Sequence, residues 1–227
     1  MFFCPEAKTS LDVVQFLVQE NPNIAYFTFC SYKMPSPQET VNEAGDLIKT
    51  LICHKENDDF SPLSAHNITK HGLIEMCEAL PSDRCLALRS RAKTLDGENL
   101  FFPLIDFSLP RTDTDLAKLT IIRDLLTQIH QLYQYKGSAF LLKTRKSYHY
   151  YGTSPLRKES WLRLLGLFLL LHPRNEDCKT SLELGFSTII DARFIGHALL
   201  AGQGSLRISP DAHTGFPKVV AEIKPII

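Results

Sequence analysis

Two aspartates stand where apolar segments of the chain end. Asp106 follows residues 101–105, and Asp191 follows residues 187–190. A carboxylate at the end of a buried strand is held rigidly, as a metal ligand or a general base must be. Two such carboxylates can meet across a sheet and share one divalent cation, because Mg²⁺ keeps several water ligands of its own. The alternative for Asp106 is a helix N-cap or a loop acid ahead of Pro110.

A basic and aromatic segment lies between the two aspartates. Residues 138–158 contain five lysines or arginines and no acidic residue, and tyrosines are interleaved with them. Positive charges bind phosphates and aromatic rings stack on bases, so this composition favours a nucleotide or nucleic-acid site. In an alternating strand Ser147 and His149 share a face. With Lys143 and Arg145 nearby, this hydroxyl and imidazole would grip a phosphate. The alternative is a solvated basic turn with a satisfied histidine.

A third group of polar residues lies near the end of the chain. Arg193 and His197 are four residues apart, so they share a face if this piece is helical. Arg207 lies in a short segment after Gly204, from which it could project into a cleft. A site-facing arginine must find an anion, which makes Arg207 a candidate ligand for phosphate. Structural salt bridges would explain each of these residues equally well.

Periodicity, turn signals and helix breakers predict the elements that must position these side chains. Helices are expected from Leu11 to Pro22, which ends the first one, and at 40–53, 69–80, 112–135, from Pro155 to 171, and at 193–200. Strands are expected at 24–32, 85–91, 100–107, 138–142, 147–152, 187–190, 205–209 and 218–223. Hairpins are expected around the turns at 96–99 and 143–146, and residues 54–59 are expected to form a polar loop.

Paired strands with helices between them predict an α+β fold with an antiparallel sheet core. The pattern changes near Pro81 and Ser82. We therefore expect an N-terminal α/β unit over residues 1–82 and a second unit over 83–227. The alternative is one compact domain over 1–227, which a chain of this length allows.

Composition narrows the class of protein. The 227 residues are 44% hydrophobic, which is enough for a core, and 25 basic residues balance 25 acidic ones, so net charge does not indicate a nucleic-acid binder. No apolar run approaches the ~20 residues of a membrane span, and residues 1–5 do not resemble a signal peptide. Six cysteines without a Cys-x-x-Cys pair predict reduced thiols in a cytoplasmic protein that has no membrane contact. The sequence also lacks the P-loop, Gly-x-Ser-x-Gly and dinucleotide fingerprints.

The order of these motifs resembles the archaeo-eukaryotic primase superfamily. That family carries an Asp-x-Asp motif, a Ser-x-His motif and a late hydrophobic-Asp motif in its catalytic lobe. Here the matching residues are Asp106 with Ser108, then Ser147-Tyr148-His149, then Ile190-Asp191. The stretch 193–209 is similar to that of bacterial primase-like members. The resemblance covers about residues 85–224.

The resemblance implies an RRM-like antiparallel sheet packed beside a smaller α/β unit, with the site between them. It also implies that Asp106 and Asp191 bind Mg²⁺ or Mn²⁺, that His149 belongs to the catalytic set, and that Ser147 and His149 contact the phosphates of a nucleoside triphosphate. The implied activity is nucleotidyl transfer on single-stranded nucleic acid, with a helicase or another replication or defence protein as a partner. Lys143, Arg145 and Arg207 are added from the residues themselves.

One departure from the family pattern bears on this activity. Ser108 stands where the second carboxylate of Asp-x-Asp belongs. A neutral hydroxyl replaces an anionic bridging ligand poorly, because two cations ~4 Å apart repel strongly. Either Asp113 or Asp115 reaches back, or one metal suffices, or the activity is lost. Two alternatives to an enzyme therefore stay open: an inactive primase-fold module that binds nucleotide or single-stranded nucleic acid, and a structural subunit whose basic strand contacts an acidic partner.

Overall fold

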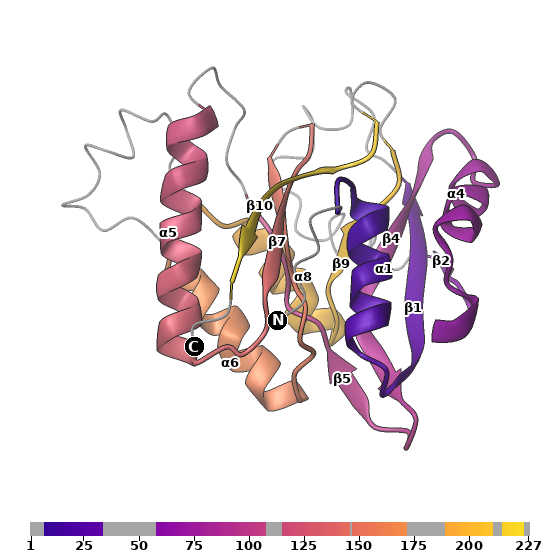
Figure 1. Cartoon of the computed structure of the whole chain (residues 1–227), viewed down its shortest axis with the longest axis horizontal. Helices are drawn as coiled ribbons and strands as arrows, with labels where there is room; N and C mark the ends of the chain where they lie inside the picture. Colours follow the sequence, from indigo (N-terminus) through magenta and orange to yellow (C-terminus); the bar gives the residue numbers. More distant parts are fainter. Residues whose placement is uncertain are drawn as a thin grey trace.

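The computed structural model describes residues 7–33, 58–107, 115–145, 147–171, 189–210 and 215–224. In these residues the fold is α+β, as expected (Figure 1). The α-helices are α1 (Ser10–Glu20), α4 (Lys70–Glu78), α5 (Asp115–Tyr133), α6 (Lys158–Leu169) and α8 (Ala192–Ala201), and η1 (Ala65–Asn67) is a 3₁₀ turn. The strands are β1 (Ile24–Lys33), β2 (Asp58–Asp59), β3 (Leu63–Ser64), β4 (Arg84–Thr94), β5 (Asn99–Phe101), β6 (Leu104–Asp106), β7 (Ala139–Lys143), β8 (Tyr148–Gly152), β9 (Ser205–Arg207) and β10 (Lys218–Ile223).

The strands form two antiparallel sheets. The first has the order β2-β1-β4-β5, with β3 paired to β1 and β9 paired to β4. The second has the order β10-β7-β8-β6. The predicted antiparallel sheet core is therefore confirmed. The predicted boundary near residue 82 stays a prediction, and β1 and β4, which lie on either side of it, pair along most of their length.

The segment 100–107, expected to be one strand of a hairpin, contributes to both sheets. β5 pairs with β4 around the expected turn, whereas β6 pairs with β8 in the second sheet. The change occurs at Phe102 and Pro103. Proline has no N–H to donate to a ladder, and here its carbonyl accepts a hydrogen bond from Gly152 N at 2.8 Å. The chain thus leaves the first sheet at this proline, and Asp106 is carried into the second.

Several other expected elements differ in their bounds. The helix expected to open at Pro155 begins at Lys158, with Arg157 as its N-cap. Residues 58–59 of the expected polar loop form β2. The expected helix at 40–53 lies outside the described residues, as do 112–114, 187 and 188. None of the helices among the described residues is long and apolar enough to cross a membrane.

Two hydrophobic cores lie on opposite faces of the second sheet. One joins the two sheets and is covered by α1 and α4, with Leu17, Phe29 and Phe140 among its buried residues. The other lies under α5, α6 and α8, where Trp161 stacks on Phe101 with ring centroids 5.0 Å apart. Alternation in β7 and β8 divides their side chains between the two cores. Figure 1 shows α1 beside the second sheet and α5 and α6 on its other side.

Candidate functional site

Strand pairing brings Asp106 and His149 together. In the antiparallel ladder between β6 and β8 their Cα atoms are direct partners, so the two side chains share one face of the sheet. His149 Nε2 lies 3.7 Å from Asp106 Oδ1. The side chain of His149 is nearly buried, whereas 32% of the Asp106 side chain is exposed. The carboxylate therefore reaches the surface beside an imidazole that is part of the interior.

Asp191 joins this pair through the backbone. Phe107 and Ile190 form an isolated antiparallel bridge, and Asp191 N donates a hydrogen bond to Asp106 O at 3.0 Å. Asp191 is also the N-cap of α8, because its Oδ1 accepts from Arg193 N at 2.9 Å and from Phe194 N at 3.2 Å. Both capping bonds use the same carboxylate oxygen.

Arg207 completes the group from the other sheet. Its strand, β9, pairs with β4, and Tyr151 of β8 donates its hydroxyl hydrogen to the Arg207 carbonyl at 3.1 Å. This bond connects the two sheets beside the site. The positive charge of Arg207 acts on the pKa values of both Asp106 and His149, so its guanidinium belongs to the same electrostatic environment.

The pKa values of Asp106 and His149 reflect their burial and the charged groups beside them. Burial raises the pKa of Asp106 above its ordinary value, the negative charge of Asp191 raises it further, and Arg207 opposes both. Burial lowers the pKa of His149 to about 3, and Arg207 acts in the same direction. His149 is therefore a neutral imidazole at neutral pH, and burial together with the negative charge of Asp191 disfavours the ionised form of Asp106.

The hydroxyl of Ser147 is already engaged. Ser147 Oγ donates to the carbonyl of Phe107, the residue after Asp106. Thr144 closes the turn before it, because Thr144 N donates to Ser147 O at 2.8 Å and Ser147 N donates to Thr144 Oγ1 at 3.0 Å. Ser147 thus fixes the end of β8 against the segment that carries Asp106.

Lys143 and Arg145 do not join Asp106 and His149 in these contacts. The Cα partner of Lys143 is Tyr148, which precedes His149 in β8, so Lys143 and His149 leave the sheet on opposite faces. Arg145 is exposed in the turn between β7 and β8. Asp106, His149, Asp191 and Arg207 are brought together, whereas these two basic residues lie at the end of the neighbouring hairpin.

Arg89 is a charged residue that the sequence reading did not single out. It lies in β4, two residues from Ala87, whose Cα partner is Arg207, so the two arginines share a face of the first sheet. Arg89 is 7% exposed. The signal that could have found it is an arginine directly after the apolar run from Cys85 to Leu88, in the same strand, where a charge needs a specific partner.

The donors fit a divalent cation of the Mg²⁺ type. Asp106 and Asp191 supply carboxylate oxygens, and Mg²⁺ commonly uses one or two carboxylates and completes its shell with water and phosphate. In the part of the chain that the structure describes, no group of three or more histidines, cysteines, aspartates or glutamates is arranged to hold a metal. Ser108 and Asp113 lie outside the described residues.

Residues 64–219 match the family model described as AEP-like, archaeo-eukaryotic primase 1D-like. The match covers more than half of the chain, so the chain belongs to this family and is a primase-fold protein. The expected resemblance to archaeo-eukaryotic primases is confirmed. No curated protein and no solved structure matches the chain.

Proposed function

We propose that this protein is a metal-dependent, primase-polymerase-like nucleotidyltransferase that acts on nucleoside triphosphates and nucleic acid. The observation that carries the proposal is the hydrogen bond from Asp191 N to Asp106 O at 3.0 Å. This backbone bond holds two aspartates from distant parts of the chain next to each other, close enough for the charge of Asp191 to act on Asp106, beside His149 and within the field of Arg207. Membership in the primase family supports the same reaction class.

Each residue of the group has a role in this proposal. Asp106 and Asp191 would hold Mg²⁺ or Mn²⁺, which would supply positive charge to neutralise the triphosphate and polarise its oxygens. Arg207 presents a planar guanidinium, which suits two oxygens of one phosphate. His149, kept neutral by burial, donates a ring N–H to phosphate without adding charge.

The chemistry is the attack of a 3′-hydroxyl on the α-phosphorus of a nucleoside triphosphate. The O3′–Pα bond forms, the bond from the α-phosphorus to the β-phosphate oxygen breaks, pyrophosphate leaves, and the hydroxyl proton passes to water. Such a transfer needs positioning and charge stabilisation more than covalent chemistry. Arg207 and His149 would hold the triphosphate, while Asp106 and Asp191 orient the reacting end. Ser147 would act as a positioning residue, because its hydroxyl holds the Phe107 carbonyl next to Asp106.

A primer-extension assay tests this proposal. The full chain is incubated with labelled primer, single-stranded template and nucleoside triphosphates, with Mg²⁺ or Mn²⁺, and is compared with Asp106→Ala. We expect extension by the wild type and a loss of about 100-fold or more in the variant, as removal of several kcal/mol of charge stabilisation requires. Asp124→Ala removes an exposed carboxylate on α5 and serves as the control. Absence of product with either metal, or full activity of Asp106→Ala, rejects the proposal.

A binding module without chemistry is the second candidate. Ser108 in place of the second carboxylate favours it, because an anionic ligand is missing from the motif. In that case nucleotide raises the melting temperature, no product forms, and Asp106→Ala still binds. His149→Ala should then weaken binding. A chain whose melting temperature does not respond to nucleotide would instead fit a structural subunit.

A further inference from the structure

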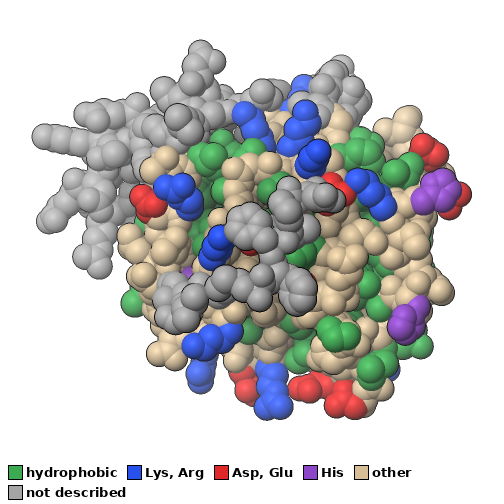
Figure 2. Space-filling view, viewed as in Figure 1, with side chains coloured by type: hydrophobic (Ala, Val, Ile, Leu, Met, Phe, Trp, Pro, Cys, Tyr) green, Lys and Arg blue, Asp and Glu red, His purple; other side chains and the backbone are tan. Residues whose placement is uncertain are grey.

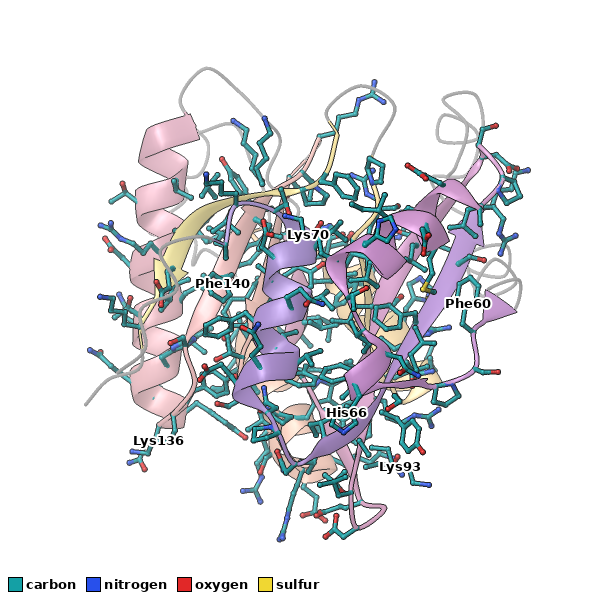
Figure 3. The ribbon with its side chains drawn as sticks, turned by 45° about the vertical axis from the view of Figure 1, so that its right-hand side comes forward. Phe60, His66, Lys70, Lys93, Lys136 and Phe140 are labelled. Carbon is teal, nitrogen blue, oxygen red and sulfur yellow. The ribbon has the colours of Figure 1, made fainter. Side chains whose placement is uncertain are left out.

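A tyrosine hydroxyl connects the two sheets beside the candidate site. Tyr151 of β8 is fully buried in the core that joins the sheets, and its hydroxyl donates to the Arg207 carbonyl at 3.1 Å. A phenol hydroxyl inside an apolar core needs a hydrogen-bond partner, and Tyr151 finds it in β9 of the other sheet. Its Cα partner in β7 is Phe140, which Figure 3 shows beside α1, so the ring itself is held by packing.

The backbone around Arg207 is fixed to the first sheet on both sides. Before Arg207, Ser90 N donates to Gly204 O at 2.8 Å, and after it Ile208 N donates to Leu86 O at 2.9 Å. The position of β9 is therefore set by β4, with which it pairs. The carboxylate and the imidazole that lie near the guanidinium belong instead to β6 and β8 of the second sheet.

The distance between the Arg207 guanidinium and the Asp106 carboxylate thus depends on how the two sheets are placed relative to each other. Apolar packing is non-directional, so it fixes the relative position of two sheets less sharply than a hydrogen bond with its preferred length and angle. Tyr151 lies two residues after His149 on the same face of β8, and their ring centroids are 6.3 Å apart. The bond from Tyr151 is therefore located where it can fix Arg207 against Asp106.

The charge of Arg207 reaches three groups of the second sheet. These are Asp106, His149 and Tyr151; burial has the largest effect on the pKa of each, and the arginine lowers all three pKa values. Burial raises the pKa of Tyr151 above its ordinary value of 10, so its hydroxyl stays protonated and remains a donor. Figure 2 shows lysine and arginine side chains gathered at the upper end of the molecule, above β7 and β10 as they lie in Figure 1. An anion that approaches this end meets a field of the right sign.

We propose that Tyr151 is a positioning residue, which holds Arg207 at the distance from Asp106 at which both act on one triphosphate. The proposal rests on the proposed function, because it names what sets the geometry of that site. Tyr151 is buried and acts through the Arg207 backbone without touching the substrate. Loss of its hydroxyl lets the guanidinium move relative to the carboxylate, and a displacement of about 1 Å can reduce a rate on the order of 100-fold.

Tyr151→Phe tests the proposal, because phenylalanine keeps the ring and removes only the hydroxyl. Steady-state primer extension by the full chain gives kcat and the KM for the nucleoside triphosphate. We expect KM to rise about tenfold with a smaller change in kcat, because Arg207 loses part of a charge-assisted hydrogen bond that it makes both before and during the reaction. The melting temperature should fall by about 2–4 °C, which corresponds to the loss of one hydrogen bond in a chain of this length.

A double variant separates positioning from stability. In Arg207→Ala the backbone carbonyl remains, so the Tyr151 hydroxyl keeps its acceptor although the guanidinium is gone. Adding Tyr151→Phe to Arg207→Ala should therefore lower the melting temperature as it does in the wild type, but leave KM unchanged. A merely structural hydroxyl would instead change KM by the same factor in both backgrounds.

Tyr135→Phe is the matched control for the loss of a buried hydroxyl. Tyr135 is also buried, and its hydroxyl donates to Ser154 O at 2.8 Å. Ser154 lies beyond Gly152, at the end of β8 opposite to His149, and Figure 3 shows Lys136, the neighbour of Tyr135, at the lower end of the molecule. We expect Tyr135→Phe to lower the melting temperature without changing KM. Equal effects of Tyr135→Phe and Tyr151→Phe on KM would overturn the proposal.

Binding of inorganic tripolyphosphate gives a readout that needs no catalysis. Its dissociation constant is measured by calorimetry with Mn²⁺ for the wild type and the same variants, and we expect the pattern described for KM. If the wild type extends no primer while Tyr151→Phe weakens tripolyphosphate binding only when Arg207 is present, the proposed function fails and the role of Tyr151 stands. If the wild type extends primers and Tyr151→Phe leaves KM unchanged, the role of Tyr151 alone fails. A wild type that neither extends primers nor binds tripolyphosphate contradicts both.

Discussion

At the scale of single residues, the interior beside the second sheet contains two histidines that burial keeps neutral. His149 lies against Asp106, whereas His130 of α5 is remote from the carboxylates in sequence and packs among tyrosines. His130 Nε2 lies 2.8 Å from the hydroxyl of Tyr150, and the side chain is buried in the core under α5 and α6. Burial lowers the pKa of His130 to about 4 from its ordinary value of 6.5.

We therefore expect stability to depend on pH through His130. Between pH 6.5 and about 4 the unfolded chain binds a proton that the folded chain does not, so the free energy of unfolding rises with pH in this window. The contribution of the neutral ring is complete above about pH 6.5 and is lost as the pH falls toward 4. The full change is roughly 3 kcal/mol at 1.36 kcal/mol per pKa unit. Urea unfolding of wild type and His130→Gln at several pH values measures it.

The difference in unfolding free energy between wild type and His130→Gln should change across the window, because glutamine does not titrate. Parallel curves for wild type and His130→Gln would show that the buried ring carries none of the pH dependence.

At the scale of elements, Asp191 has two roles, as a helix cap and as a charged group, and different substitutions can separate them. As the N-cap of α8 it accepts two backbone hydrogen bonds, and as a carboxylate it lies beside Asp106. Asparagine caps a helix about as well as aspartate but carries no charge, whereas alanine does neither. We expect Asp191→Asn to keep the melting temperature and lose nucleotidyl transfer, and Asp191→Ala to lose about 1 kcal/mol of stability as well. Wild-type activity of Asp191→Asn would remove this residue from the reaction.

The crossing between the sheets makes a second prediction at this scale. A Cβ at Gly152 would lie 2.7 Å from the hydroxyl oxygen of Tyr135 and 2.9 Å from Pro103 Cγ. We expect Gly152→Ala to lower the free energy of unfolding by about 1–3 kcal/mol, as overpacking does. Gly166→Ala in α6 is the matched change, because its Cβ would meet nothing within 4 Å and alanine favours a helix. If urea unfolding shows Gly152→Ala to be as stable as Gly166→Ala, the crossing is not closely packed.

Local sequence patterns predict the positions of helices and strands better than they predict which strands pair. The hairpin of β7 and β8 could be predicted because its strands alternate and a polar turn separates them. The pairing of β6 with β8 could not be predicted in this way, because Pro103 interrupts a segment whose composition otherwise indicates a single strand. The sequence allows an N-cap role for Asp106, yet of the two aspartates it is Asp191, directly before α8, that caps a helix. Sequence order alone does not show which carboxylate meets which N–H groups.

At the scale of the whole molecule, the candidate site depends on packing between the two sheets. Asp106 and His149 belong to the second sheet and Arg207 to the first, and the core that contains Phe29 and Phe140 joins them. The motif order predicted that distant segments would meet. It did not predict the buried Arg89 beside Arg207, because the place of Arg89 depends on the register of paired strands. Register is decided by tertiary packing, which a motif does not contain.

This packing predicts that the molecule unfolds cooperatively. β1 pairs with β4 across the predicted boundary near residue 82, and α1 packs into the core that also contains Phe140. Trp161 is the single tryptophan and reports on the other core, whereas far-UV circular dichroism reports on all helices. We expect both signals to change at the same urea concentration. Two separate transitions would mean that residues 1–82 fold independently of the rest.

We propose that Asp106 and Asp191 hold one cation beside His149, although the three residues come from distant segments of the chain. Fe²⁺ can replace Mg²⁺ at such a site, and with ascorbate and peroxide it cleaves the backbone close to where it binds. We predict cleavage near 106–107, near 149 and near 190–191, suppressed by Mg²⁺ or Mn²⁺ and lost in Asp106→Asn. Cleavage at only one of these segments, or cleavage that Asp106→Asn leaves unchanged, would contradict the account.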